Sequence, residues 1–532
     1  MASSSIHESA DWETGNDLII VSDAASATAR ETVQPPAASL LGHELKTLAR
    51  ESSHYLAGLI GNLALGFVSF PIFTRVLSVS EYGIMDLGQR LLLMLTIASK
   101  LGFQNASLRF YNRQEFAKSV TSERSYYSTL FFGMLANSVT VGLLFLLAAG
   151  LLPTASILGS LANLVYLILG LSLLRAMGSV LWGFMRIEER TKTFNILQVT
   201  TKATTLAIVF ALLAWIGPYA RAYFVGALGV EAVLVVALTL WLISRRVLIP
   251  RCFNISFFRA AFAFGAPLVL YEFAFAVLGS ADRFLVRHYV GANALGLYSV
   301  AYGLAANVNE FLIAPLTLAL VPIYLRIWTS DGPQKTSAFL TLAFDLFILT
   351  AAGVLAAVAT AGHSALVLLA SSKYSRADSL IPVILCGLLI WTANIFVGAG
   401  LFIHKQTVKM AGFLVFAAIA NILLNCLLLP RMGIMGGAIA TLLSYLVFIV
   451  SVAWASGRLL PLHVDLQSCA KYAVAALIAW MVGSQLRIDT AALSFMAKSA
   501  VVLTVYVSVL YALSNRVRSA INWAFTWIRA RC

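Results

Sequence analysis

Long apolar runs recur along the chain from His54 to Leu513, and short segments with Gly, Pro or charged residues separate them. A helix needs about 20 apolar residues to cross roughly 30 Å of hydrocarbon. The runs are continuous rather than alternating, which disfavours the strands of an outer-membrane barrel. The pattern predicts about fourteen membrane-spanning helices, at residues 54–74, 83–106, 126–149, 160–182, 194–216, 221–243, 259–279, 296–320, 339–362, 380–403, 408–429, 433–455, 470–486 and 493–514.

Composition supports an all-α integral membrane protein. The 532 residues are 60% hydrophobic and 11% charged, whereas soluble domains carry about 25% charged residues. The net charge of +14 does not indicate a nucleic-acid partner, because the basic residues sit in short loops between apolar runs. Five scattered cysteines form no CxxC pair and are interpreted as core residues.

The basic residues lie in every second loop between the apolar runs, and this alternation predicts the topology. The opposite loops are nearly free of charge, as at 151–159. Because positive loops stay in the cytoplasm, both termini are predicted to be cytoplasmic. The bases that carry this prediction include Arg109, Arg113, Lys118, Arg124, Arg186, Arg190, Lys192, Arg245, Arg246, Arg251, Arg259, Arg326, Lys335, Lys405, Lys409, Arg458 and Lys471.

The chain divides into four predicted parts. Residues 1–50 are rich in Ser, Ala, Thr and acids and lack the pattern of a signal peptide, so we expect a disordered cytoplasmic tail. A six-helix lobe at 51–250 and a second at 251–457 follow. Residues 458–532 supply two further helices and a basic cytoplasmic tail.

An internal repeat relates the two lobes. Leu77–Gly83 follows the first predicted helix, and Val290–Gly296 follows the seventh, at an offset of about 213 residues or six helices. Each segment is interpreted as a short connection that ends on Gly and opens the next helix. An even number of helices per repeat gives parallel halves, between which a substrate path can lie.

Several segments resemble the polysaccharide biosynthesis proteins, or oligosaccharide flippases, of the multidrug/oligosaccharidyl-lipid/polysaccharide exporter superfamily. The resemblance spans about residues 50 to 460. It rests on Thr74–Gly83, Leu101–Phe103, Leu108–Tyr111, Ala281–Phe284, Gly296–Ala301, Asn421–Asn425, Pro430 and Gly433–Thr441.

The resemblance implies two six-helix bundles arranged as a V around a central cavity that opens alternately to each side. It also implies a substrate, a polyprenyl-diphosphate-linked oligosaccharide for surface polysaccharide, often moved with a cation gradient. The implied location is a bacterial inner membrane. The implied partners are this substrate, membrane lipids and the polysaccharide polymerase and export machinery.

Ionisable residues within spans are costly and are candidate functional residues. The first half holds Arg90, Arg175 and Lys202, which we expect to bind the diphosphate, because Arg donates two parallel hydrogen bonds to phosphate. Lys100 is a fourth candidate. The second half is expected to have no basic residue deep in a span.

Structural interpretations of the same bases stay open. Asp86 and Arg90 are four residues apart on one helix face and can simply pair. Lys100 lies near the inner end of its helix, where its side chain can reach the headgroups. Arg175 and Lys202 can form interhelical pairs with Glu231.

The second half offers acids instead. Glu272, Glu310 and, less strongly, Asp345 are candidates to bind Na⁺ or to exchange a proton. The alternative is hydrogen bonding across helices, which is also our expectation for Asn421 and Asn425.

No enzyme signature is present. There is no GxxxxGK[ST] loop for ATP and no paired Cys/His ligands for a metal. We therefore expect neither an enzyme nor a bound cofactor. Two alternatives to a flippase remain: a drug or small-molecule exporter of the same superfamily, and a non-transporting membrane component of polysaccharide assembly.

Overall fold

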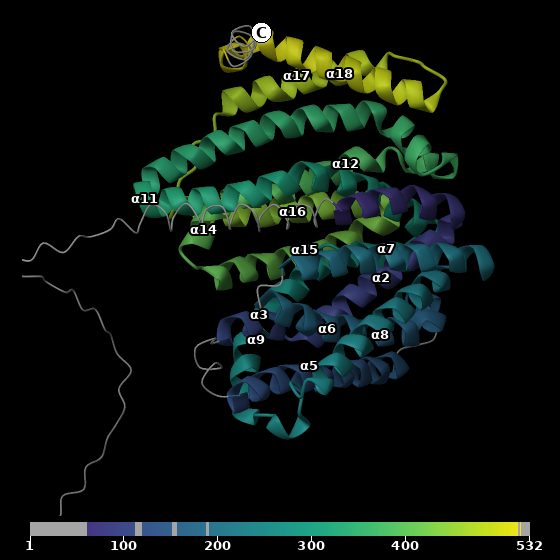
Figure 1. Ribbon diagram of the computed structural model, residues 1–532. Coiled ribbons are helices and arrows are strands. Elements are labelled where there is room, and N and C mark those ends of the chain that lie inside the picture. The colour runs from purple at the N-terminus through teal and green to yellow at the C-terminus, as the bar shows by residue number, and fades with distance from the viewer. Residues whose placement is uncertain (1–60, 112–119, 152–156, 188–190, 520–521, 523–532) are drawn as a thin grey trace, which may run out of the picture. The chain divides into compact units, whose positions relative to one another are not determined.

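The computed structural model describes residues 61–111, 120–151, 157–187, 191–519 and 522, so the predicted tail at 1–50 lies outside the described residues. Within them every regular element is a helix (Figure 1). The first helix covers residues 61–76. The others are α2 (Val79–Lys100), α3 (Phe103–Phe110), α5 (Val120–Leu151), η1 (Ile157–Leu164), α6 (Val165–Ile187), α7 (Thr191–Trp215), α8 (Ala220–Ser244), η2 (Pro250–Cys252), α9 (Ile255–Leu278), α10 (Ala281–Tyr289), α11 (Ala292–Leu369), η3 (Ser372–Ala377), α12 (Leu380–Thr392), α13 (Asn394–Val397), α14 (Ala399–Ile403), α15 (Thr407–Met432), α16 (Ile434–Gly457), α17 (Leu466–Ser484) and α18 (Ala491–Leu513).

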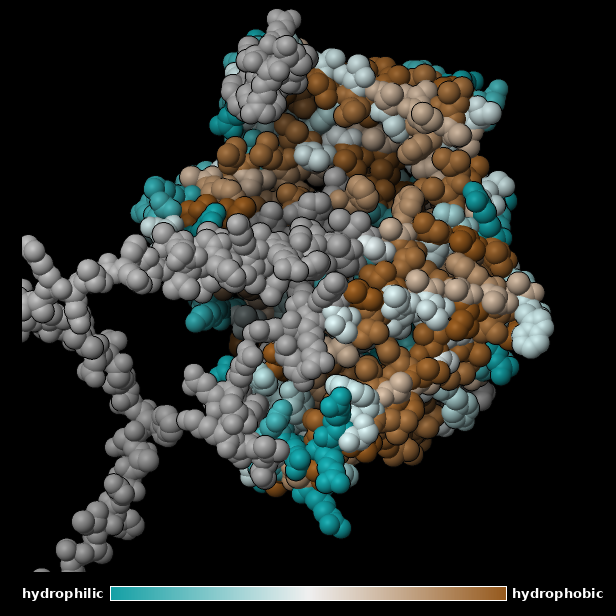
Figure 2. Space-filling model, in the orientation of Figure 1, coloured by the Kyte–Doolittle hydropathy of each residue, from teal (hydrophilic) through white to brown (hydrophobic). Residues whose placement is uncertain are grey.

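The helices have the length and surface of membrane spans. Eleven of those in the described residues are long and apolar enough to cross a bilayer. Apolar side chains cover most of the surface along the helices, and hydrophilic residues gather towards the helix ends (Figure 2). The predicted class of all-helical membrane protein is confirmed, while the number fourteen stays a prediction.

The largest departure from the predicted helices is α11, which contains two predicted spans, 296–320 and 339–362, without an intervening loop. Only Gly332 interrupts its helical backbone, with φ 84° and ψ −176°. Glycine adopts this conformation at little cost because it has no Cβ. We call residues 292–331 the first arm of α11 and residues 333–369 its second arm.

The start of α2 also differs from the prediction. Ser78 is the N-cap and accepts a hydrogen bond from the Glu81 amide, so the helix already begins at Val79. Gly83 therefore lies inside α2, and Gly296 lies inside α11 rather than at its start. The two repeat glycines do not end a connection as predicted; they face a neighbouring helix.

The two repeats meet along α2. We call the helices between residues 61 and 244 the first lobe and those between 255 and 457 the second lobe; the predicted domain boundaries stay a prediction. Near the start of α2, a Cβ on Gly83 would lie 2.7 Å from the Gly296 amide nitrogen. Near its end, a Cβ on Gly265 in α9 would lie 3.0 Å from the Cα of Gly102. The lobes thus touch backbone to backbone near both ends of α2.

The last two helices, α17 and α18, pack on the second arm of α11 (Figure 1). A separate core joins them, in which Tyr472 and Tyr506 are buried beside Ala356. The Tyr506 hydroxyl donates a hydrogen bond of 2.6 Å to the Leu349 carbonyl in α11. These helices are therefore attached to one arm of the second lobe.

Candidate functional site

A cavity of about 600 Å³ lies between helices of the first lobe and the first arm of α11. Its apolar wall includes Phe70, Phe73, Met85 and Trp182. Its polar lining comes from the helix at 61–76 and from α2, α6, α7, α8 and α11, and consists of Asn62, Ser69, Tyr82, Asp86, Gln89, Arg90, Arg175, Gln198, Thr201, Lys202, Thr205, Tyr223, Glu231, Ser299 and Asn307.

Three predicted substrate-binding bases line this cavity together: Arg90 from α2, Arg175 from α6 and Lys202 from α7. Two acids, Asp86 and Glu231, also line it. The charged lining of this cavity therefore carries one net positive charge. The bases are far apart in the sequence, and only the packing of the first lobe brings them to one space.

Each of these bases also has a structural partner. Arg90 Nε donates to Asp86 Oδ1 at 3.2 Å, one helical turn away. Arg175 Nε donates to Glu231 Oε1 at 3.0 Å. Lys202 Nζ donates to the Asn62 carbonyl at 2.6 Å rather than to Glu231. The two arginines remain about one-third exposed, at 31% and 35%, so pairing leaves them accessible from the cavity.

Lys100 lies beside this cavity rather than in it. It lines a smaller pocket of about 160 Å³ with Gln104, Arg186 and Gln198. Gln198 and Trp182 line both spaces, so the two adjoin. Lys100 is thus placed next to the other three bases, with a second base, Arg186, beside it.

The predicted coupling acids are not brought together. Glu272 lies in α9 and Glu310 in the first arm of α11, and neither lines the cavity of the three bases. Asp345 lies in the second arm of α11, in a different cavity of about 450 Å³. There it accepts a 3.0 Å hydrogen bond from the Tyr472 hydroxyl and lies 3.8 Å from Arg516.

A buried charge cluster was missed by the sequence analysis. Arg283 in α10 has a fully buried side chain, so the expectation of no deep basic residue in the second half is wrong. Its Nε donates to Asp86 Oδ2 at 3.0 Å, and its Nη1 donates to Asp282 Oδ1 at 2.9 Å and to the Gly279 carbonyl at 2.8 Å. A charge this deep requires such partners.

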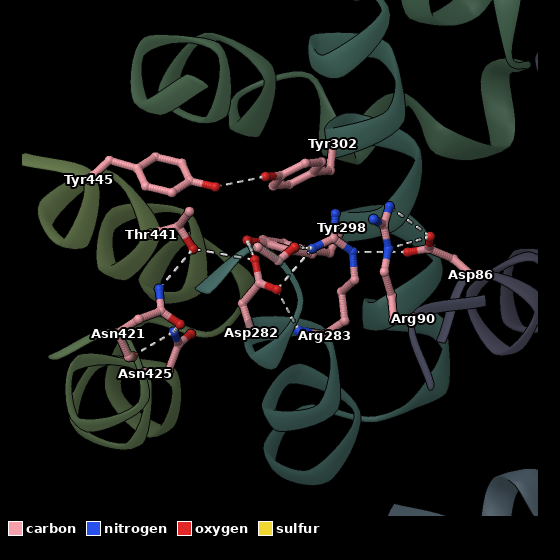
Figure 3. Close-up of polar contacts among 11 residues, drawn as sticks. Asp86, Arg90, Asp282, Arg283, Tyr298, Tyr302, Asn421, Asn425, Thr441 and Tyr445 are labelled. Atoms are coloured by element: carbon pink, nitrogen blue, oxygen red, sulfur yellow. Dashed lines mark hydrogen bonds and ion pairs between the residues drawn. The ribbon is translucent and has the colours of Figure 1, made fainter. Parts of the chain in front are cut away.

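The cluster continues through the second lobe (Figure 3). Asp282 Oδ2 accepts hydrogen bonds from the Tyr298 hydroxyl at 2.6 Å and from Thr441 Oγ1 at 3.3 Å. Asn421 then donates to Thr441 Oγ1 at 3.4 Å, and Asn425 donates to Asn421 Oδ1 at 3.1 Å. The expected hydrogen bond across helices is present for Asn421, whereas Asn425 donates within α15 to Asn421, one turn away. The adjacent charges Asp282 and Arg283, directly after a long apolar run, were the signal for this cluster.

Comparison with known proteins identifies the family and the fold of the chain. The profile of the family described as polysaccharide biosynthesis protein matches residues 48–328, more than half of the chain. The uncharacterized membrane protein MJ1068 of Methanocaldococcus jannaschii is 23% identical over 213 residues, which are 39% of this chain and 41% of that protein. The chain therefore matches less than half the length of this curated relative.

Two solved structures share the fold. The lipid II flippase MurJ, in an inward closed conformation, is 13% identical with a TM-score of 0.67 over 88% of this chain and 100% of that chain. An inward-facing multidrug resistance transporter of the MATE family, in the MOP superfamily, is 13% identical with a TM-score of 0.59 over 76% of this chain and 94% of that chain.

Proposed function

The chain belongs to the polysaccharide biosynthesis protein family, and from this premise we propose that it flips a polyprenyl-diphosphate-linked oligosaccharide across the inner membrane of a bacterium. Movement is by alternating access of the central cavity, with both termini in the cytoplasm. Family and fold are those of multi-pass membrane transporters. The observation that carries the proposal is the convergence of Arg90, Arg175 and Lys202 on one cavity.

The lining chemistry favours an anionic headgroup. A diphosphate needs cationic donors where water is scarce, because an ion pair is stronger in a medium of low dielectric constant. Guanidinium groups can donate two hydrogen bonds to one phosphate. A volume of about 600 Å³ suits a headgroup, since small-ligand cavities measure about 300–1,000 Å³. We therefore assign the diphosphate to the bases and the first sugars to the amides and hydroxyls around them.

The proposed cation coupling involves Glu272 and Glu310. Glu310 is on the first arm of α11, which lines the cavity through Asn307, and Glu272 is on α9, which packs on α2. A proton or Na⁺ bound at either acid would therefore change the charge near the substrate path. Asp345, in its separate cavity, is the weakest of the three candidates and serves as a matched comparison. Glu272→Gln and Glu310→Gln should each reduce gradient-dependent transport more than Asp345→Asn; full gradient dependence in both would contradict the coupling role.

The flippase proposal is tested with the purified full chain in liposomes and a fluorescent polyprenyl-diphosphate sugar. Protein-dependent flipping should be lost in the Arg90→Gln, Arg175→Gln, Lys202→Gln triple variant. The matched control changes three exposed bases of the same types, Arg326, Lys409 and Arg431, to Gln. Normal flipping by the cavity variant, with both proteins folded, would refute the site.

A small-molecule exporter is the second candidate, and one observation favours it: Asp86 and Glu231 put two carboxylates in the same cavity, where they could pair with a cationic drug. Efflux of a cationic dye without flipping of any diphosphate-linked sugar would favour this reading. We place polymerase and export machinery among the proposed partners, to be sought by co-purification from a membrane extract.

A further inference from the structure

One carboxylate, that of Asp86, is shared by two guanidinium groups from different lobes (Figure 3). Arg90, on the same helix, binds Oδ1 through Nε and Nη2, each at 3.2 Å. Arg283, from α10 of the second lobe, binds Oδ2 through Nε at 3.0 Å. Each oxygen of Asp86 thus has a different arginine as its partner.

The two arginines differ in what they can reach. Arg90 lines the cavity and is 31% exposed. Arg283 is 0% exposed, and its guanidinium carbon lies 3.9 Å from the centre of the Tyr302 ring. A substrate in the cavity can therefore contact Arg90, whereas Arg283 acts on it only through Asp86.

We propose that Arg283 is a positioning residue of the diphosphate site: by holding one oxygen of Asp86, it shares the charge of this acid and keeps it from cancelling the charge of Arg90 in full. The inference rests on the proposed function. Because α10 belongs to the opposite lobe, the affinity of the cavity for an anion depends on whether the lobes meet at this point. The cavity holds its substrate while they meet and releases it when they separate.

The charges remain balanced in both states. With the lobes together, Arg90, Arg283, Asp86 and Asp282 form a neutral group of four. When α10 moves away, Asp282 stays with Arg283, since the two are adjacent in the chain and joined by a 2.9 Å ion pair. Asp86 then pairs with Arg90 alone of these two arginines, and both carboxylate oxygens of Asp86 can face the Arg90 guanidinium. The charge of Arg90 is cancelled without any proton or ion being moved.

The contact between the lobes beside Asp86 is a close approach of two helix backbones. One turn before Asp86, the lobes touch through the backbones of Gly83 and Gly296, with the side chains of Leu295 and Val79 beside them. The two glycines themselves have no side chain that must be repacked when this contact opens. Arg283 and Asp86 form a polar contact between the lobes at this point, and its loss on opening changes the charge at the substrate site.

The test is a double-mutant cycle on the detergent-purified full chain, with Kd measured for a fluorescent polyprenyl diphosphate. Arg283→Gln should weaken binding about tenfold, within the 5–150-fold range of typical couplings between sites. Asp86→Asn combined with Arg283→Gln should restore the wild-type Kd to within about threefold, because no carboxylate then cancels the charge of Arg90. Asp86→Asn alone should bind at least as tightly as wild type but flip more slowly.

A merely structural role predicts the opposite for the double variant, which would then bind as weakly as Arg283→Gln or more weakly. That result would overturn the proposal. Because Arg283→Gln leaves Asp282 buried without its partner, the neutral variant Asp282→Asn, Arg283→Gln is measured beside it and should bind as weakly. Unchanged binding in this neutral variant would also overturn the proposal.

The Arg90→Gln variant distinguishes a failure of the proposed diphosphate site from a failure of the proposed role of Arg283. If Arg90→Gln leaves binding unchanged, the diphosphate site itself is wrong, and with it the proposed function. If Arg90→Gln abolishes binding while both Arg283 variants bind normally, the site stands and the positioning role of Arg283 is refuted.

Discussion

Replacing Gly296 by alanine should drive the two lobes apart where α11 meets α2. The new Cβ would overlap the Val79 carbonyl oxygen and lie 2.7 Å from both the carbonyl carbon and Cγ1 of Val79. Carbon atoms in contact prefer separations of about 3.5–4.0 Å, so the helices must move apart by roughly 1 Å. The neighbour is largely backbone, which cannot move aside as a flexible side chain can.

The size of the effect follows from the cost of overpacking, which is about 1–3 kcal/mol. This penalty falls only on the conformation in which the two glycines touch. It therefore shifts the conformational equilibrium about 5–150-fold toward states in which the lobes are separated there. We expect slower flipping. We also expect the cavity to become more accessible from the side of the membrane that the loop charges predict to be outside the cell.

Accessibility is measured with a cysteine in place of Ser69, which lines the cavity and is 9% exposed, in a chain whose five native cysteines are replaced. A membrane-impermeant maleimide added to intact cells should label it at least fivefold faster in Gly296→Ala. Gly142→Ala is the control, since its new Cβ meets nothing within 4 Å. Equal labelling and equal transport in the two variants would refute the reasoning.

Three further predictions concern single side chains. Glu231→Ala should lower the free energy of unfolding by about 1–3 kcal/mol, because it removes the acid that holds Arg175; thermal unfolding measures this, and Glu231→Gln should lose less. Lys373→Met should speed maleimide labelling of the cavity, because Lys373 donates hydrogen bonds of 2.6 and 3.1 Å to two carbonyls of the opposite lobe; unchanged labelling would contradict this role. The hydrogen bond from Ser468 lowers the pKa of Asp465 below its ordinary value of 3.8, so the stabilisation by this N-cap is present above pH 3.8 and is lost as the pH falls through the lowered pKa. Asp465→Asn should therefore lower the Tm at pH 7 and have no effect once the pH is below that pKa.

The sequence was informative wherever a signal is local. Continuous apolar runs predict spanning helices because a bilayer imposes one length on all of them. A base within such a run is conspicuous, so Arg90, Arg175 and Lys202 could be chosen from the sequence. Their shared cavity could not be predicted from spacing alone, since it depends on how α2, α6 and α7 pack.

The predictions that failed concern residues whose contacts are distant in the sequence. Asp282 and Arg283 stand just after an apolar run and look like the loop residues that end a span. Their burial follows from Asp86, which is 197 residues away from Arg283 in the chain. The repeat glycines were found by pattern, but their role was misassigned: the sequence suggests a turn, and only the packing of α2 on α11 shows a close backbone contact.

The length of α11 has a mechanical consequence. At 1.5 Å per residue, each of its two arms is about 55–60 Å long, roughly twice the thickness of the hydrocarbon layer. The elbow at Gly332 must then stand in water, among the polar residues Thr329, Ser330 and Lys335. The second arm, with α17 and α18 attached, continues directly from this elbow, with no flexible loop between the two arms. A soluble ligand that bound the elbow and made it rigid would therefore slow the movements of the attached helices inside the bilayer, although the ligand itself would bind outside the bilayer.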